Sequence, residues 1–498
     1  MRFRVFLIIF IFCIAGWFLF TYKLIDVPPG INGDEAAIGY SAALISKKGY
    51  DSSGKFLPLF TTISWPDWKQ PVTIYSTVLM FKLFGISYFN LKAVSVLFVL
   101  VSGIIIFFLI REIFDERFAA LSFLIYSTIP IIMIQSHLAI ENIAPVPFVA
   151  LWLLMITKYT KIRKTKYLIF SAVALGISIY SYLGLRLIMP ILTILSVLYI
   201  YYLNKGLKLR GKKVTLRHIF IFLAVLIPFF IILLLIKNQY PAAAFALNRP
   251  QHLQSYQQFL LPYISSFDLS FLFMKGDLTP YHSTGRQGMF LLATLPLFIM
   301  GLFFIAKERK PMYIFILAVF FLSPILYGLP GQIYRASRLL SLIPAFIVIC
   351  TFGIKGLFKI RRKTVKVLSL FVIILLIFLN YVDFLFDYWF DYPQRVNQSF
   401  EKPLHRVFDY TSKLSKKENL EVFIQDDAPL RNPTVYSFFE NAYFPKGLRR
   451  WTEKQDLPVR SIIMISAQVY HRIHKPGDIE TIDYGSMDLS LLINRSMK

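Results

Sequence analysis

Residues 5–22 read VFLIIFIFCIAGWFLFTY, an apolar run without a charged side chain. A helix of about 20 such residues matches the ~30 Å hydrocarbon core of a bilayer. Arg2 and Arg4 precede the run, and Asp26-Val27-Pro28-Pro29 follows it where a signal peptide would show a small-residue cleavage site. We therefore interpret the run as an uncleaved first membrane span.

Ten further runs of the same kind follow along the chain. Of the 498 residues, 56% are hydrophobic and only 16% are charged, whereas soluble domains carry about 25% charged residues. Because lipid cannot satisfy an unpaired backbone, each run predicts a helix. The predicted spans are 5–22, 91–110, 118–135, 143–157, 167–182, 187–203, 219–237, 289–306, 312–327, 339–354 and 367–385.

The cations alternate between loops. Residues 158–166 and 205–217 are rich in Lys and Arg, whereas 135–142 has none. The positive-inside rule therefore places the N-terminus in the cytoplasm and, after an odd number of spans, the C-terminal tail outside. The net charge of +26 follows from this topology, so it does not indicate nucleic-acid binding. We expect a multi-pass protein of the cytoplasmic membrane.

The tail after the last span has a different pattern. Residues 421–425 and 461–466 predict strands, and 434–441 predicts a helix between them. The expected fold class is an all-α polytopic membrane protein with a small C-terminal extracytoplasmic α/β domain. The predicted domains are a transmembrane domain over 1–390, with outer loops 23–90, 238–288 and 328–338, and an α/β domain over 391–498.

The first outer loop opens with two adjacent carboxylates, in Gly33-Asp34-Glu35-Ala36. They begin an amphipathic stretch that reaches Ile45, which predicts a helix on the membrane surface capped by Gly33 or Asp34. Asp34 can be a general base or metal ligand at the bilayer face. The alternative is that Asp34 only caps the helix.

Other ionisable residues lie at the predicted outer ends of spans. His137 and Glu141 are four residues apart, so they share one helix face. They predict either a site, as intramembrane ionisable groups usually do, or a simple pair at the water boundary. Arg186, after Tyr180-Ser181-Tyr182, is suited to binding a phosphate or to reaching lipid head groups.

Two later loops add further polar groups. The segment 275–288 contains Asp277, His282 and Arg286, and its polar and glycine content predicts an ordered loop over a cavity. Arg335 and Arg338 lie three residues apart at the predicted start of a helix, a good anion site. Guanidinium groups beside a carboxylate at a membrane face suit the stabilisation of a lipid-phosphate leaving group.

Taken in order, these segments resemble the polyprenyl-phosphate-sugar-dependent glycosyltransferases of the GT-C fold. The resemblance is strongest to the bacterial branch related to the dolichyl-phosphate-mannose protein mannosyltransferases and to the aminoarabinose transferase of lipid A. The matching pieces are Gly33 to Ala36 with Tyr40, Gly54 to Pro58, Gln70-Pro71 with Tyr75, Tyr180 and Tyr182 with Arg186 and Pro190, Gly276-Asp277 through His282 to Gly288, and Tyr334-Arg335 with Arg338 and Pro344.

The resemblance implies a lipid-linked sugar donor in the outer leaflet and gives each candidate a role. Asp34, with Glu35 beside it, corresponds to the family's catalytic base or metal ligand. A divalent metal, Mg or Mn, held by Asp34 and Glu141 stays open as a cofactor. Where many relatives carry an arginine in the second outer loop, this chain has His137. The residues implied to bind the donor phosphate are Arg335, Arg338 and Arg186, and those implied to line the substrate pocket are His282, Arg286, Tyr182, His137 and Tyr334.

The function expected from these residues is an inverting transfer of a sugar from a polyprenyl phosphate to an extracytoplasmic acceptor. That acceptor can be a protein hydroxyl, a lipid or a cell-wall glycan. Two alternatives are a flippase or transporter for lipid-linked glycans and a glycan-binding membrane protein. A flippase needs charges at mid-depth in the spans, whereas here the ionisable groups cluster at outer helix ends.

Overall fold

The computed structural model describes residues 2–63, 67–204, 210–243, 255–396, 398–400, 403–426, 433–472, 479–484 and 489–496. The chain divides into two units. The helical unit comprises Met1–Tyr22, Ser64–Thr73 and Ala93–Tyr392. The mixed unit comprises Lys23–Ile63, Ile74–Lys92 and Pro393–Lys498. The first outer segment thus belongs largely with the C-terminal residues.

Each of the eleven predicted spans overlaps a helix or, in one case, a broken helix pair. Seven helical segments are long and apolar enough to cross a membrane, or eight if the bent pair is one span. The protein is therefore a multi-pass membrane protein, and the count of eleven spans stays a prediction. The helices are α1 (Arg2–Thr21), α4 (Tyr88–Ile113), α5 (Glu116–Ser127) with α6 (Pro130–Ser136), α7 (Pro145–Ile162), α8 (Thr165–Ser178), α9 (Met189–Asn204), α10 (Arg210–Leu235), α13 (Leu295–Glu308), α14 (Pro311–Leu322), α16 (Ile343–Phe358) and α17 (Lys363–Phe386).

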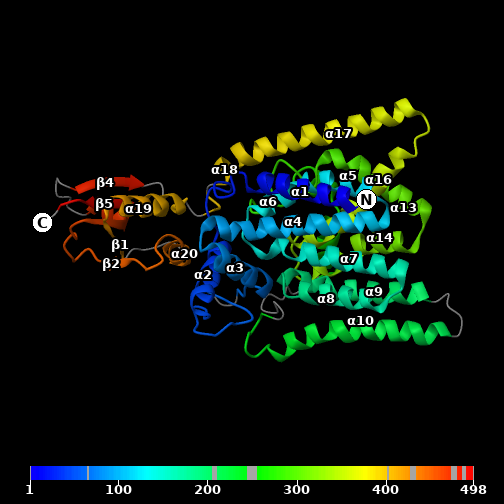
Figure 1. Ribbon diagram of the computed structural model, residues 1–498, viewed down its shortest axis with the longest axis horizontal. Coiled ribbons are helices and arrows are strands. Elements are labelled where there is room, and N and C mark those ends of the chain that lie inside the picture. Colours follow the sequence, from blue (N-terminus) through cyan, green and yellow to red (C-terminus); the bar gives the residue numbers. More distant parts are fainter. Residues whose placement is uncertain are drawn as a thin grey trace. The chain divides into compact units, whose positions relative to one another are not determined.

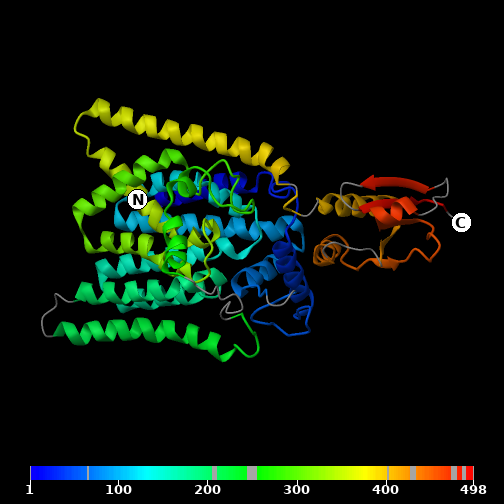
Figure 2. The same ribbon diagram turned by 180° about the vertical axis from the view of Figure 1, so that it is seen from behind.

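The long helices run nearly parallel within the helical unit (Figures 1 and 2). The span that ends with α16 is 94% buried in its apolar window, whereas the windows of α10 and α17 are 17% and 6% buried. Accordingly, α10 and α17 lie at opposite edges of the bundle in both views. Helices that are apolar and yet exposed in this way have lipid as their solvent.

One predicted span is broken. Residues 118–135 were expected to form a single helix, but α5 and α6 meet at an angle of 65°. Pro130 is the first residue of α6, and proline cannot donate the hydrogen bond that would continue α5. The break brings Gln135 and Ser136, at the end of α6, into the buried interior of the helical unit.

Glycines allow α13 and α16 to pack backbone against backbone. A Cβ on Gly301 would lie 1.9 Å from the carbonyl oxygen of Ile349, and a Cβ on Gly353 would lie 2.1 Å from that of Leu297. Helices in lipid associate through such small residues because close van der Waals contact replaces the hydrophobic effect.

Gly353→Val is expected to destabilise the helical unit, because the Leu297 carbonyl that the new side chain would meet cannot move without displacing α13. Overpacking typically costs about 3 kcal/mol or less, and backbone contact places this site at the upper end. The apparent unfolding temperature in detergent measures the effect. Ile299→Val, on a side chain of α13 that is 56% exposed, is the control and should leave that temperature unchanged. An unchanged temperature for Gly353→Val would contradict the close crossing.

The mixed unit begins with helix α2 (Gly33–Lys48). Its N-cap is Asn32, not Gly33 or Asp34 as predicted. The Asn32 Oδ1 accepts a hydrogen bond from the Glu35 backbone N–H at 2.9 Å, and the Glu35 Oε2 accepts one from the Asn32 N–H at 3.0 Å. This reciprocal capping box fixes the start of the helix.

Helix α2 packs against the C-terminal part of the chain. A Cβ on Gly39 would lie 2.8 Å from both Leu91 and Phe438, and Phe438 belongs to α20 (Pro433–Tyr443). Nearby, the buried ammonium of Lys92 lies 4.7 Å from the centre of the Tyr88 ring. The acid-bearing helix and the C-terminal domain therefore form one packed structure.

The C-terminal sheet has the strand order β2-β1-β3-β5-β4. Strand β1 pairs in parallel with β2 and β3, and β5 pairs antiparallel with β3 and β4. The strand–helix–strand prediction is confirmed by β1, α20 and β3, and residues such as Trp451, Ile463 and Leu492 form the core. The remaining elements are α19 (Leu404–Glu418), β1 (Glu421–Gln425), β2 (Arg449–Trp451), β3 (Ser461–Ser466), α21 (Ala467–Arg472), β4 (Ile479–Tyr484) and β5 (Leu489–Asn494).

Shorter helices connect the spans. In the first outer segment α3 (Pro71–Phe84) follows α2, and in the segment between α10 and α13 lie α11 (Tyr256–Ser265) and α12 (Leu269–Phe273). The single turn α15 (Ala336–Leu339) precedes α16, and α18 (Tyr392–Arg395) follows α17 through a π-helical turn at Asp387–Asp391.

Candidate functional site

Gln70 connects the outer loop 135–142, which contains Glu141, to Arg186. Its backbone N–H donates a hydrogen bond to the carboxylate of Glu141. Its side-chain Oε1 accepts one from the Arg186 Nη2 at 2.5 Å. Because Gln70 precedes α3 and Glu141 precedes α7, this contact joins three separate segments within the helical unit.

All three nitrogens of the Arg186 guanidinium donate hydrogen bonds. Its Nε donates to the carbonyl oxygen of Ile179 at 3.1 Å, and its Nη1 donates to that of Ala243. Burial lowers the pKa of the guanidinium to about 10, while the nearby Glu141 carboxylate opposes that shift. The group thus stays a cation at neutral pH. Its hydrogen bonds go to backbone carbonyls and to the Gln70 side chain.

Tyr182 brings a further outer segment to the same region. Its side chain is half-buried. It hydrogen-bonds to Ser337 and lies within electrostatic range of Arg338, Arg335 and Glu141. The segments around Glu141, Tyr182 and α15 therefore converge, as the sequence predicts for a site made of several outer loops.

Arg335 precedes the single turn of α15, and Arg338 lies within it. Arg335 is the N-cap residue, and its Nη1 lies 3.9 Å from the Asp277 Oδ1. The Arg338 Nη2 donates to the Gln332 Oε1 at 2.6 Å. Its Nη1 is buried, and within the described part of the chain it has no hydrogen-bond partner. Two guanidiniums three residues apart, one of them with a buried donor to spare, favour an anion.

Four predicted pocket residues make contacts elsewhere in the helical unit. The His282 Nδ1 lies 2.9 Å from the Gln135 Nε2, and the His137 ring packs 5.4 Å from that of Tyr388. The Tyr334 ring lies 5.7 Å from that of Phe271.

Arg286 is the fourth of these residues. Its Nη1 forms ion pairs with Asp387 at 3.1 Å and Asp391 at 3.0 Å. These contacts tie the loop 275–288 to the end of α17. In the structure Arg286 thus has two carboxylate partners, whereas the predicted phosphate-binding Arg338 contacts the neutral amide of Gln332 and the ring of Tyr327.

Asp34 and Glu35 belong to the mixed unit and differ in their surroundings. Glu35 is fully buried and serves the capping box, whereas Asp34 is exposed in the first turn of α2. Since Asn32 is the N-cap, the alternative that Asp34 only caps the helix is wrong. Of the two predicted catalytic carboxylates, Asp34 is the one accessible to a substrate.

Sequence reasoning gave no role to two residues of the region. Gln70 is fully buried, and its neighbour Lys69 is 6% exposed with its Nζ 2.6 Å from the Asp67 carboxylate. A neutral amide gives no charge signal, so the role of Gln70 as a connector depends on the fold. Lys69 is one of several lysines of the first outer segment, so the sequence did not single it out.

The predicted metal ligands, Asp34 and Glu141, belong to different units. Glu141 already accepts the Gln70 N–H. Within the described ranges, no group of three or more His, Cys, Asp or Glu side chains is placed to hold a metal ion. The divalent cofactor stays a prediction.

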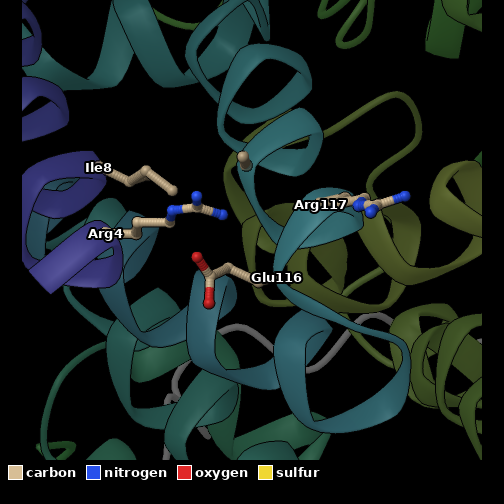
Figure 3. Close-up of a pocket in the computed structure, with 5 residues that line it drawn as sticks. Arg4, Ile8, Glu116 and Arg117 are labelled. Carbon is tan, nitrogen blue, oxygen red and sulfur yellow. The ribbon is translucent and has the colours of Figure 1, made fainter. Parts of the chain in front are cut away.

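None of these residues lines the cavity of about 470 Å³ that is drawn in Figure 3. It is lined by Arg4, Ile8, Glu116, Arg117 and Ala120, at the N-terminal ends of α1 and α5. Arg4 and Glu116 point toward one another across it, and Arg117 points away. The predicted topology places these helix ends on the cytoplasmic side, so this cavity is separate from the candidate site.

The chain is similar to known membrane glycosyltransferases in sequence and in fold. Residues 68–232 match the family model of the dolichyl-phosphate-mannose-protein mannosyltransferases. Over the whole length, the chain is similar to the structure of ArnT from Cupriavidus metallidurans in the apo state. The TM-score is 0.56 at 12% identity, and the alignment covers 97% of both chains. The chain has the GT-C fold.

Two further structures share this GT-C fold. ArnT from Cupriavidus metallidurans bound to undecaprenyl phosphate aligns over 98% of both chains, with a TM-score of 0.56 and 12% identity. The oligosaccharyltransferase from Archaeoglobus fulgidus in the apo form aligns over 87% of this chain and 63% of its own, with a TM-score of 0.51 and 13% identity. No curated protein matches the sequence. The resemblance drawn from the motifs is confirmed for the GT-C fold.

Proposed function

We propose that the protein is a membrane glycosyltransferase that moves a sugar from a polyprenyl-phosphate donor to an extracytoplasmic acceptor. The observation that carries the proposal is the convergence of Glu141, Tyr182 and the two arginines of α15 within a GT-C fold. A protein of this fold, ArnT from Cupriavidus metallidurans, is known bound to undecaprenyl phosphate.

In this proposal Arg335 and Arg338 hold the donor phosphate. Charge-assisted hydrogen bonds from guanidinium to phosphate are among the strongest in proteins. They strengthen as the bond between the anomeric carbon and the phosphate oxygen breaks, because the leaving phosphate gains negative charge. The buried Nη1 of Arg338 is the donor that we assign to this task.

Asp34 is the proposed base. It accepts the proton of the acceptor hydroxyl while the oxygen forms its bond to the anomeric carbon, and the phosphate leaves with the electron pair of the broken bond. A single displacement inverts the anomeric configuration. Asp34 lies at the start of a capped helix, so its backbone position is fixed, and its side chain is exposed and accessible to a substrate. A protein hydroxyl, a lipid or a cell-wall glycan can serve as the acceptor.

A transfer assay tests the proposal. Purified protein in lipid nanodiscs is incubated with a cell-envelope extract and, in turn, with several radiolabelled polyprenyl-phosphate sugars. We expect one label to leave the lipid and an equal amount of polyprenyl phosphate to accumulate. The proposal is wrong if no donor loses its label and the protein also fails to bind undecaprenyl phosphate.

A further inference from the structure

The loop 275–288 is folded around its own polar groups. The Ser283 Oγ donates to the carbonyl oxygen of Lys275 at 2.9 Å and accepts the N–H of Gly285 at 2.9 Å. Gly276 has a φ of +77°, and a Cβ there would lie 2.4 Å from the Ser283 Oγ. This turn presents the next residue, Asp277, to the interior.

The carboxylate of Asp277 is fully buried. Its Oδ1 accepts hydrogen bonds from the Thr279 N–H at 2.8 Å and the Thr279 Oγ1 at 2.7 Å. Its Oδ2 accepts one from the backbone N–H of Ala336 at 2.7 Å. One oxygen thus accepts hydrogen bonds from the loop 275–288 and the other from the first residue of α15, so the side chain bridges two outer segments.

The bridge ends between the two arginines of α15. Ala336 follows Arg335, and the Arg335 Nη1 lies 3.9 Å from the Asp277 Oδ1. Tyr334, the residue before Arg335, has a φ of +53°, a backbone conformation that residues other than glycine seldom adopt. A backbone of this kind persists only where its surroundings fix it, and the Asp277 bond to Ala336 is one such constraint.

From these contacts we infer that Asp277 is a positioning residue for donor binding, because it fixes the segment that presents Arg335 and Arg338 to the phosphate. The inference rests on the proposed function. Asp277 does not touch the donor. It acts through the backbone of α15 and the Arg335 side chain.

Two effects of Asp277 on an anion have opposite signs. A carboxylate beside Arg335 repels a phosphate, so its charge alone weakens binding. Its hydrogen bonds hold the arginines in place, so its geometry strengthens binding. A variant that removes charge and bridge together therefore shows by its direction which effect dominates.

Asp277→Asn is that variant. The amide keeps the volume of the side chain, but it has only one acceptor oxygen, so it cannot serve both Thr279 and Ala336. We expect the Kd for undecaprenyl phosphate, measured with the purified full-length protein in nanodiscs, to rise about tenfold. Thr279→Val removes one of the two bonds to Oδ1 without a change in charge, and it should raise the Kd about threefold.

Asp268→Asn is the matched control. Asp268 lies in the same outer segment but outside the loop 275–288, and it caps α12 by accepting the Phe271 N–H at 3.0 Å. Its Kd should equal that of the unchanged protein. If the Kd of Asp277→Asn is equal to or lower than that of the unchanged protein, the inference is wrong. If Asp277→Asn does not fold, an unchanged Kd for Thr279→Val overturns the inference instead. If Arg338→Ala also leaves the Kd unchanged, the proposed phosphate site is itself wrong.

Discussion

Replacing Asp34 by asparagine is expected to lower the rate of sugar transfer about 10³-fold. The amide has nearly the same shape as the carboxylate but cannot accept the proton of the acceptor hydroxyl. Because Asp34 is exposed and is not the N-cap of α2, the protein should express, insert and melt as before. The measurement is the initial rate of label transfer at saturating donor.

Two other acids of the first outer segment make this result specific. Asp51 is buried, and its Oδ1 accepts hydrogen bonds from Ser53 and Lys55. Asp51→Asn should therefore leave the rate unchanged. Glu35→Gln removes a buried charge near Lys92, so we expect it to lower the unfolding temperature. If Asp34→Asn retains most of the activity, Asp34 has no part in the chemistry.

Arg335→Ala and Arg338→Ala should each raise the KM for the donor about 10- to 100-fold. A hydrogen bond to a charged group contributes about 1.5–3 kcal/mol, and every 1.4 kcal/mol is a factor of about ten in affinity. The kcat should fall as well, because the same groups stabilise the departing phosphate. Steady-state kinetics with varied donor concentration separate the two parameters.

The control for these variants is an outer arginine with another task. Arg406, in α19, pairs with Asp26 at 2.8 Å and is largely exposed, so Arg406→Ala should leave the donor KM unchanged. Arg338→Lys should retain part of the binding that Arg338→Ala loses, since lysine supplies the charge without the planar pair of donors. Equal KM values for all these variants would exclude α15 as the phosphate site.

The membrane helices could be predicted because each needs one property, an apolar run long enough to cross the bilayer. Residues 91–110 lie within α4 and 367–385 within α17 for this reason. The break between α5 and α6 was missed although Pro130 is visible in the sequence. Pro228 lies inside α10 and Pro262 inside α11, so a proline in an apolar run does not by itself predict a break.

In the C-terminal tail, too, some elements could be predicted from the sequence and others could not. Strands β1 and β3 are dense in β-branched residues and were predicted with their observed bounds, whereas β2 is a three-residue edge strand, Arg449–Trp451, with almost no pattern of its own. The parallel pairing of β1 with β2 and β3 depends on the helices between them, so local sequence does not determine it.

At the site, charge gave the candidates but not their partners. Arg186, Arg286 and Arg335 look alike in the sequence. In the structure the first bonds to backbone carbonyls, the second to two aspartates, and the third lies beside Asp277. The cap of α2 could have been found, because Asn32 followed three residues later by Glu35 is a capping-box signal. The bridging roles of Gln70 and Asp277 needed the fold.

Equilibrium binding of undecaprenyl phosphate tests the central claim most directly, because it separates the binding of the donor phosphate from the chemistry. The account predicts that the unchanged protein and Asp34→Asn bind with the same Kd, whereas the double variant Arg335→Ala/Arg338→Ala binds at least about 100-fold more weakly. Undiminished binding by the double variant would contradict the account.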